Sequence, residues 1–353
     1  KDMTLLSDRP TRNEWIHTSD APKTQKHAAG VLNAFDDWLK SMDTTEEEFF
    51  NAMRKADMNT RARTIKAIQE YWMTVPKEGY AVKGVRTTAQ YRATLLTWLE
   101  ENDIIISLTK LKRLAKLPKK LVEMKYTPDS AHVLNIVAGQ SDIEKKAFFS
   151  LLSCTAMRYG ELLETRLSHI DVSDRRIQIP AENTKTRSER LTFFTPEARH
   201  YLKRHLKENN ITSPDEKIFR LSRAAYEFAL KRSNLSYGMD EKFTNGRSKM
   251  SIHRLRAYAN QCIQAACGDK FSEVILGHIG GLRIYDVGNI RKMKKDYDKA
   301  IPLLTLDKSK QYEDLLESSQ AENKTAKIVM SEIENLKQEI LRLENSIPVA
   351  TSI

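Results

Sequence analysis

The segment Thr155-Ala-Met-Arg158-Tyr-Gly-Glu161-Leu162 joins two stretches of helical periodicity in the middle of this 353-residue chain. A helix is expected over about 142–155, and Glu161 is expected to open the next helix, where the positive end of the helix dipole stabilises a carboxylate. Arg158 would then lie in the turn between two rigid elements. The segment predicts a helical domain with an arginine at a helix junction.

Downstream of this segment the pattern changes. Residues 176–179 and 190–194 alternate between apolar and polar side chains, as half-buried strands do, and the polar stretch 182–188 would form the turn between them. Thr195-Pro196 indicates the start of another helix, and helical periodicity then continues to about residue 300. We predict a mainly helical domain with a small antiparallel sheet over 121–306.

Upstream, a second helical domain is expected over 19–120. Its apolar side chains recur at helical spacing from about residue 22 to 115 and predict a bundle of four or five helices. Thr44-x-x-Glu47 and Thr87-x-x-Gln90 have the spacing of capping boxes at helix starts. Residues 1–18 are polar and aperiodic, so we expect them to form a flexible arm.

A dense run of positive charge leads out of this bundle. A solvated linker has such a composition, and a segment that binds the phosphates of DNA needs the same one. Both interpretations are therefore open. The run consists of Lys110, Lys112, Arg113, Lys116, Lys119 and Lys120.

The overall charge is positive but unevenly spread. The chain has a net charge of +11, whereas residues 311–353 hold eight acidic and four basic side chains, so the rest favours a polyanionic partner such as nucleic acid. No apolar run of about 18 residues or more indicates a membrane span, and the amino terminus lacks the apolar stretch of a secretion signal. The three cysteines lack the spacing of a zinc site or a disulfide framework. We expect a protein of the cytoplasm or the host-cell nucleoid.

The segment 307–353 is predicted to be an acidic amphipathic helix. Its apolar residues are separated by alternating steps of three and four, with Ile and Leu at the positions that favour a parallel two-stranded coiled coil. A helix docked on its own protein would have the same stripe, so self-association through 326–347 and internal docking are both open. The stripe consists of Ala326, Val329, Ile333, Leu336, Ile340, Leu343 and Ile347.

Six side chains of the domain over 121–306 suit a phosphodiester transesterification without metal or cofactor. A guanidinium group binds two phosphate oxygens in one plane, a hairpin lysine can protonate a leaving oxygen, and histidines can donate hydrogen bonds or move a proton. A tyrosine, with an ordinary pKa of about 10, can attack phosphorus when cationic neighbours activate it. No carboxylate cluster with magnesium-binding spacing is apparent, which disfavours a two-metal nuclease. The six are Arg158, Lys185, His253, Arg256, His278 and Tyr285.

The order of these motifs resembles the tyrosine recombinase, or phage integrase, family. That family's signature is a T-x-x-R-x-x-E-L segment, a lysine in a β-hairpin, H-x-x-R, L-G-H and a final nucleophilic tyrosine. This chain has Thr155–Leu162, Thr184-Lys185-Thr186, His253–Arg256 and Leu276–His278 in the same order. The resemblance covers about residues 22–305.

The resemblance implies a helical core-binding domain followed by a catalytic domain. It also implies cleavage of one DNA strand at a time through a 3′-phosphotyrosyl intermediate, by a tetramer on two specific sites in double-stranded DNA. Arg158 and Arg256 would clamp the scissile phosphate, Lys185 would act as general acid, and His253 and His278 would assist.

By the same resemblance, Glu161 would orient the active-site arginines. The chain departs from the family in one place: Tyr285 follows His278 more closely than is usual, and Gly280-Gly281 replaces a more polar turn. Tyr297 is therefore an alternative nucleophile. We prefer Tyr285, because Tyr297 falls within a predicted helix that follows the nucleophile in the family.

The leading functional hypothesis is a site-specific integrase of a virus or mobile element. A chromosome-dimer resolvase of the Xer kind and a type IB topoisomerase would use related chemistry. A catalytically silent DNA-binding regulator of the same fold is the alternative from a different class, and the intact set of six side chains argues against it.

Overall fold

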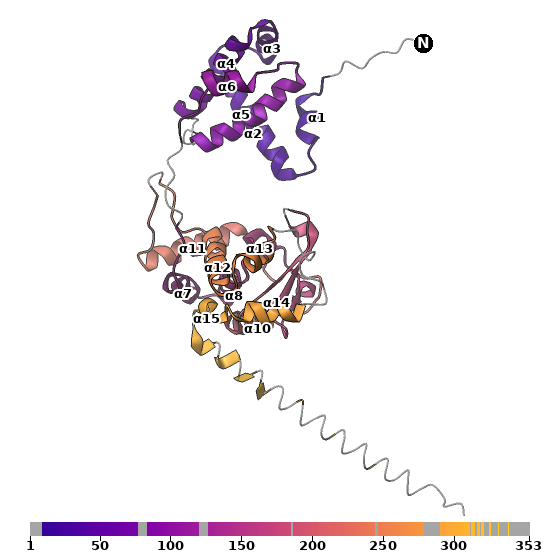
Figure 1. The fold of residues 1–353 in the computed structure, drawn as a ribbon, viewed down its shortest axis with the longest axis vertical. Coiled ribbons are helices and arrows are strands. Elements are labelled where there is room, and N and C mark those ends of the chain that lie inside the picture. Colours follow the sequence, from indigo (N-terminus) through magenta and orange to yellow (C-terminus); the bar gives the residue numbers. More distant parts are fainter. Residues whose placement is uncertain are drawn as a thin grey trace, which may run out of the picture. The chain divides into compact units, whose positions relative to one another are not determined.

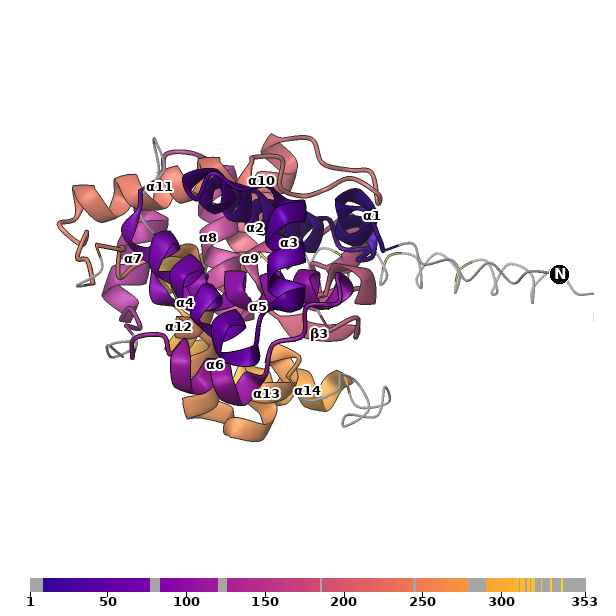
Figure 2. The same cartoon turned by 90° about the horizontal axis from the view of Figure 1, so that it is seen from above.

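The computed structural model describes residues 9–76, 83–119, 126–184, 186–243, 246–278 and 290–310, with scattered positions of the tail (312–314, 316, 317, 319, 320, 325, 331 and 338). The chain divides into two compact units, Lys1–Val122 and Glu123–Ile353, which Figures 1 and 2 draw from two directions. Each unit has its own apolar core.

The first unit is a helical bundle with an aromatic core. The ring centroids of Phe35 and Phe49 lie 5.1 Å apart, edge to face, and the Trp72 indole donates a hydrogen bond to the Ala34 carbonyl (2.9 Å), which joins two helices. Its helices are α1 (Arg12–His17), α2 (Pro22–Ser41), α3 (Glu46–Lys55), α4 (Met58–Thr74), α5 (Val85–Glu101) and α6 (Leu108–Leu114).

The helix α1 corrects the prediction of a flexible arm for residues 12–17, whereas residues 1–8 of that arm lie outside the described residues. This helix begins at a capping box, in which the Thr11 N–H donates to the Glu14 carboxylate (2.7 Å) and the Glu14 N–H donates to the Thr11 hydroxyl (3.3 Å). The helix has six residues. So short a stretch does not reveal helical periodicity, which is why the sequence pattern missed it.

Arg12 anchors this short helix to the bundle. Its guanidinium lies 2.6 Å from the carboxylate of Asp36 in α2 and 2.9 Å from that of Glu46 in α3. Glu46 also accepts a hydrogen bond from the Trp98 indole of α5 (2.9 Å). The arginine therefore joins three helices through partners that are remote in the sequence.

Two helix starts differ from the predicted ones. Thr45, not Thr44, is the N-cap of α3, and it exchanges capping-box hydrogen bonds with Glu48 (2.8 and 3.3 Å). The Thr-Thr-Glu-Glu-Glu run satisfies the motif in two registers, so spacing alone could not decide between them. Thr87 lies inside α5, whose N-cap is Gly84.

The second unit is built around α8, which lies in its interior and is buried from Ala147 to its end (Figures 1 and 2). Its remaining helices are α7 (Ser130–Ala138), α9 (Tyr159–Leu163), α10 (Pro196–Glu208), α11 (Arg223–Ser236), α12 (Ile252–Cys267), α13 (Asp269–Leu276), α14 (Ile290–Asp298) and α15 (Ile301–Leu304), with short 3-10 turns at Leu167–His169 and Ala181–Asn183; α8 itself spans Ile143–Thr155.

The sheet of this unit has three antiparallel strands in the order β1 (Ile170–Asp171), β2 (Arg176–Ile179) and β3 (Arg190–Phe193). The prediction of a mainly helical protein with a small antiparallel sheet is confirmed. Strand β1 was not predicted, because two residues show no alternation. All four residues of β3 are buried, against the expected half-buried pattern, since α8 and α13 both pack on this strand.

Three consecutive main-chain carbonyls at the end of α8 accept hydrogen bonds from three different elements. Carbonyls at the end of a helix have no partner within it, so they are open to such donors. The donors are the Tyr297 hydroxyl of α14 to Cys154, the Thr192 hydroxyl of β3 to Thr155, and the Arg256 guanidinium of α12 to Ala156, at 2.8, 2.7 and 2.6 Å.

The start of the tail is anchored to α10. Asp314 is fully buried, and its carboxylate lies 2.6 Å from Arg199 and 3.6 Å from Lys203. The predicted coiled-coil stripe from Ala326 to Ile347 lies outside the described residues. Within the described part of the chain, no helix is both long and apolar enough to cross a membrane.

Candidate active site

Arg158 and Glu161 lie together at the start of α9, which begins at Tyr159, two residues before the helix start predicted at Glu161. The main-chain N–H of Arg158 donates to Glu161 Oε2 (2.7 Å), and its guanidinium Nη1 donates to Oε1 (2.8 Å). The Glu161 side chain is 3% exposed, whereas that of Arg158 is 28% exposed. The buried carboxylate thus holds the arginine at two points and leaves part of it accessible.

Arg190, the first residue of β3, belongs to the same cluster and was missed by sequence reasoning. Its Nη1 and Nη2 donate to the two carboxylate oxygens of Glu161 (3.0 and 2.5 Å), and its Nε donates to the Ile275 carbonyl (3.1 Å). Its side chain is 3% exposed. One signal was available in the sequence: this arginine directly precedes the apolar run Leu191–Phe194, so it could be expected to be buried. A buried charge requires a partner, and that requirement pointed to a nearby acidic side chain.

Arg256 is held by two main-chain carbonyls. Its Nη1 donates to Ala156 (2.6 Å) and its Nη2 to Leu276 (3.0 Å), and Nη1 lies 3.9 Å from Glu161 Oε2. Burial, followed by the charges of Arg158 and Arg190, lowers the pKa of Arg256 to about 10. The group is therefore still cationic at neutral pH, with its plane fixed by the two carbonyls.

One carboxylate therefore lies among three guanidinium groups. Burial alone raises the pKa of Glu161, but the hydrogen bond and charge of Arg190, followed by the hydrogen bonds of Arg158, bring this pKa below its ordinary value. The cluster keeps an excess of positive charge that suits a phosphate. Among the described residues, no group of three His, Cys, Asp or Glu side chains could hold a metal ion.

His253 lies one helical turn before Arg256 on α12 and is exposed. Partial desolvation, followed by the charges of Arg256, Arg254 and Arg158, lowers the pKa of this imidazole. The neutral ring is therefore favoured at neutral pH. The charge of Arg158 therefore acts on this imidazole as well as on Glu161.

The Leu276-Gly277-His278 segment is joined to the cluster by its glycine. Gly277 ends α13 in the left-handed region (φ +72°), and a Cβ atom there would lie 2.8 Å from Arg190 Cδ. The following residue, His278, is exposed, with its Nδ1 2.8 Å from the carboxylate of Glu273. Conformation and space thus both require glycine at position 277.

Two predicted catalytic residues, Lys185 and Tyr285, lie outside the described residues. The hairpin on either side of Lys185 is described. Thr184 is buried, and its hydroxyl donates to the Ala181 carbonyl (2.9 Å) and accepts from the Ser188 N–H (3.0 Å). This threonine therefore closes the turn that carries the lysine.

Tyr297, the alternative nucleophile, is a core residue. It is fully buried, its hydroxyl donates to the Cys154 carbonyl (2.8 Å), and its ring packs 5.6 Å from that of Phe193. Burial raises its pKa well above the ordinary value. Both the position and the protonation state of this phenol are unsuited to attack on DNA.

The basic run predicted to bind DNA belongs to the first unit. Its first part lies on α6, whose Leu111 is buried in the bundle core. Of the two interpretations left open by the sequence, a solvated linker therefore does not hold for the residues on this helix. The exposed members are Lys112, Arg113, Lys116 and Lys119, while Lys110 is partly buried and Lys120 lies outside the described residues.

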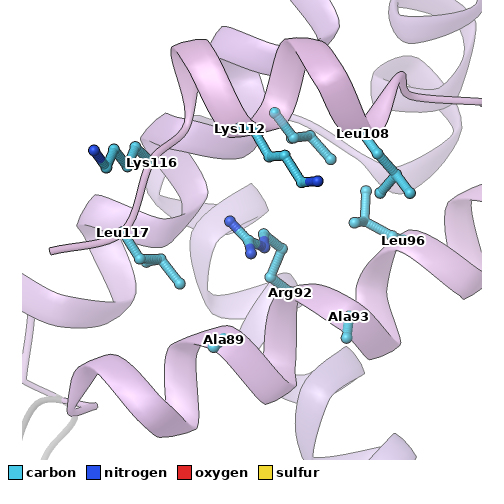
Figure 3. A pocket seen from close by; sticks show the side chains of 9 residues that line it. Ala89, Arg92, Ala93, Leu96, Leu108, Lys112, Lys116 and Leu117 are labelled. Atoms are coloured by element: carbon cyan, nitrogen blue, oxygen red, sulfur yellow. The ribbon is translucent and has the colours of Figure 1, made fainter. Parts of the chain in front are cut away.

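A groove of about 460 Å³ lies between α5 and α6 (Figure 3). Arg92 of α5 and Lys112 of α6 point into the space between these helices, over an apolar lining that includes Leu96 and Leu108. Arg92 also donates to the Ala115 carbonyl (3.2 Å), so it braces the end of α6.

Comparisons with known proteins agree with this geometry. Residues 127–285 match the family described as "Phage integrase family". A lambda integrase dimer (residues 75–356) bound to a COC′ core site is similar to this chain, with 16% identity, a TM-score of 0.55, and coverage of 81% of this chain and 92% of that one.

A lambda integrase tetramer bound to a Holliday junction is also similar, with 16% identity, a TM-score of 0.54, and coverage of 81% of this chain and 84% of that one. At these identities the likeness shows the fold alone. No curated protein matches the sequence.

Proposed function

Residues 127–285 belong to the phage integrase family of tyrosine recombinases, enzymes that cleave and rejoin DNA, and from this premise we propose that the protein is a site-specific DNA strand transferase. It cuts one strand of double-stranded DNA by forming a 3′-phosphotyrosyl bond, and the reverse reaction joins the strand to a new partner. The covalent link keeps the energy of the broken bond, so no high-energy cofactor is needed.

The observation that carries this proposal is the cluster around Glu161. The carboxylate fixes Arg158 at 2.8 Å while two main-chain carbonyls fix Arg256, and the excess charge is positive. Two preorganised guanidinium groups are what the developing charge on nonbridging phosphate oxygens requires. The segments that supply them are the motifs that the sequence singles out.

In the proposed cleavage, the phenol of Tyr285 loses its proton and its oxygen forms a bond to the scissile phosphorus. The bond between phosphorus and the 5′-oxygen breaks, and this leaving oxygen takes a proton from Lys185. Arg158 and Arg256 bind the nonbridging oxygens throughout. Joining is the reverse, with a 5′-hydroxyl attacking the phosphotyrosine and restoring the phenol.

Two considerations support Tyr285 as the nucleophile. Tyr285 follows His278 by seven positions, so their Cα atoms are at most about 25 Å apart, which tethers the phenol to the segment packed on the arginine cluster. The burial of Tyr297 and its hydrogen bond to Cys154 oppose the alternative.

The two histidines would have different roles in the reaction. His253, with a lowered pKa, is suited to accept the phenolic proton. His278 directs its Nδ1 toward Glu273, so a phosphate oxygen would be met by its Nε2. Together they would complete the site that the arginines begin.

We propose that the DNA backbone lies against the basic run that begins on α6 and continues to residue 120. Lysine and arginine side chains that neutralise phosphates supply affinity without reading sequence. By analogy with the lambda integrase assemblies, we propose a tetramer on paired sites, with further self-association through 326–347. The proposed contacts are Lys110, Lys112, Arg113, Lys116, Lys119 and Lys120.

We favour an integrase of a virus or mobile element as the biological role, acting on DNA in the cytoplasm or host-cell nucleoid. A chromosome-dimer resolvase would give the same covalent adduct. Sequence-independent relaxation of plasmid DNA would instead indicate a type IB topoisomerase. Binding to DNA without any adduct would indicate a silent regulator.

The test uses the full chain and a library of DNA duplexes with a randomised central segment. After denaturation, DNA that remains attached to the protein is captured and sequenced. We expect wild type to yield adducts at a shared sequence and Tyr285→Phe to yield none. Tyr297→Phe should still yield adducts, although the folded protein should be less stable. Absence of adducts in wild type contradicts the proposal, and adducts in Tyr285→Phe contradict the assignment of the nucleophile.

The role of Lys185 has a separate test on the site recovered in this way. Lys185→Ala is expected to slow cleavage of ordinary DNA strongly. A duplex with sulfur in place of the scissile 5′-oxygen has a leaving group that needs no proton, so the variant should cleave it at nearly the wild-type rate. An equal defect on both duplexes contradicts the role of general acid.

A further inference from the structure

We propose that Arg190 is a positioning residue for strand transfer, which holds Glu161 and the Leu276-Gly277-His278 segment in register with the two phosphate-binding arginines. The inference rests on the proposed function and assigns a role to a residue outside the family motifs quoted above. Because Arg190 is 3% exposed, it acts through its neighbours and not by contact with DNA.

All three nitrogen atoms of the Arg190 guanidinium group donate hydrogen bonds. Two nitrogens bind the two oxygens of Glu161, and Nε binds the Ile275 carbonyl at 3.1 Å. Such a planar, bidentate arrangement fixes direction as well as distance, which a lysine ammonium cannot do. The side chain therefore links α9, β3 and α13 rigidly.

The charge of Arg190 frees the other two arginines to act on a phosphate. Without it, the Glu161 carboxylate would face only Arg158 at 2.8 Å and Arg256 at 3.9 Å, and would offset the charge that they present. When Arg190 is present, its buried positive charge offsets the negative charge of Glu161. The carboxylate can then orient Arg158 without cancelling the positive field outside.

Arg190 also determines the position of the L-G-H segment. Its Cδ fills the space into which a Cβ at Gly277 would project, and its Nε holds the carbonyl of Ile275, two residues earlier. The neighbouring Leu276 carbonyl accepts a hydrogen bond from Arg256 (3.0 Å). The same short segment is thus held by two arginines immediately before His278.

A purely structural ion pair is the competing interpretation, and Arg199 provides a matched control for it. Arg199 also pairs with a buried carboxylate, that of Asp314, in the same unit, but on α10. Arg190→Gln and Arg199→Gln make the same chemical change beside a buried acid. Only the former removes a partner of Glu161.

The experiment measures adduct formation on a nicked duplex carrying the recovered site, together with DNA affinity at fixed salt. We expect Arg190→Gln to slow adduct formation by about 10- to 100-fold, which is the range found when residues that orient the ligands of a metal site are removed, and to leave DNA affinity unchanged. Arg190→Lys keeps the charge but loses the planar, bidentate contact with Glu161. Its rate of adduct formation should lie between those of Arg190→Gln and wild type. Arg199→Gln should cleave at the wild-type rate at a temperature where it is folded.

A pH profile supplies a readout that a structural role would not move. The charged groups that face Glu161 are Arg158, Arg190 and Arg256, and loss of Arg190 raises the pKa of the carboxyl. The ionised form orients Arg158, so the acid limb of the rate profile should move to higher pH in Arg190→Gln. His253 titrates in all variants, whereas the added shift should vanish in the double variant with Glu161→Gln.

The possible failures are distinct. If wild type forms no adduct, the proposed function fails and this inference fails with it. If wild type reacts but Arg190→Gln reacts equally fast, or if Arg199→Gln is slowed to the same extent, only the role of Arg190 is overturned. The role of Arg190 is also overturned if the acid limb of the rate profile lies at the same pH in Arg190→Gln as in wild type.

Discussion

Gly277 and Arg190 are in mutual contact: a Cβ atom at Gly277 would lie 2.8 Å from Arg190 Cδ. The arginine cannot yield easily, because hydrogen bonds to Glu161 and to the Ile275 carbonyl hold its far end. The glycine of the L-G-H motif is thus explained by a side chain on a different element, and by its own positive φ.

Gly277→Ala is expected to lower the free energy of unfolding by about 2–4 kcal/mol, of which the left-handed backbone accounts for about 1–3. In an Arg190→Ala background only the backbone contribution should remain. The two substitutions should therefore be less than additive by about 1 kcal/mol or more. Urea denaturation of the four proteins of this cycle measures the coupling, and strictly additive losses would contradict the contact.

Glu197→Gln is expected to change how stability depends on pH. Glu197, on α10, is 1% exposed, its Oε2 accepts from the Leu306 N–H (2.8 Å), and burial raises its pKa to about 7. Because the folded state keeps a proton that the unfolded state releases, the free energy of unfolding falls as pH rises from about 4.5 to about 7. The total fall is on the order of 3 kcal/mol.

The glutamine variant lacks this titration, so its stability relative to wild type should increase between about pH 5 and about pH 8. Burial lowers the pKa of His200, so the contribution of this residue to the free energy of unfolding increases as pH rises. This contribution is the same in both proteins and cancels in the comparison. Denaturant titrations at the two pH values give the difference. A difference that does not change with pH would show that Glu197 is ionised in the fold.

Arg12→Gln is expected to destabilise the first unit by about 1–3 kcal/mol, since it leaves the carboxylates of Asp36 and Glu46 without their shared cation. Arg9→Gln is the matched control, because the pair of Arg9 with Asp103 is exposed (48% and 68%) and worth about 0–1 kcal/mol. Thermal denaturation of both variants compares them. Equal effects would mean that the α1 anchor contributes no more than a surface ion pair.

We expect removal of the residues after 320 to lower the number of chains per particle in solution, because the apolar stripe that it removes is the proposed self-association segment. This boundary keeps Asp314 and its contacts with Arg199 and Lys203, so α10 is not disturbed. Ile340→Asp in the full chain should have the same effect, because a charge within the apolar stripe disrupts a coiled coil. Sedimentation equilibrium gives the mass of each particle, and division by the mass of its own chain gives the number of chains. The same number of chains for all three proteins would exclude self-association through the tail.

The sequence was most informative where function demands local patterns. Arg158 and Glu161 are three residues apart at a helix start, and their contact follows from that spacing. His253 and Arg256 likewise share a face of one helix. These residues could be assigned to one site because each motif carries its geometry within a few positions.

What the sequence did not indicate depends on partners that are remote along the chain. Arg190 resembles any charged residue at the start of a strand until Glu161 and Ile275 are brought against it. Arg12 lies in a polar stretch, and only the fold places Asp36 and Glu46 around it. No periodicity encodes such contacts, so the buried arginine and the helix α1 were both missed.

The end of α8 has a consequence for how the site comes into being. Its last carbonyls accept hydrogen bonds from a phenol, a hydroxyl and a guanidinium group of α14, β3 and α12, so fraying of that helix terminus would remove a contact from all three elements at once. We therefore expect the second unit and its reactive centre to unfold together, as one cooperative event. Slow amide exchange in α8 should persist for as long as the arginine cluster is intact and disappear with it.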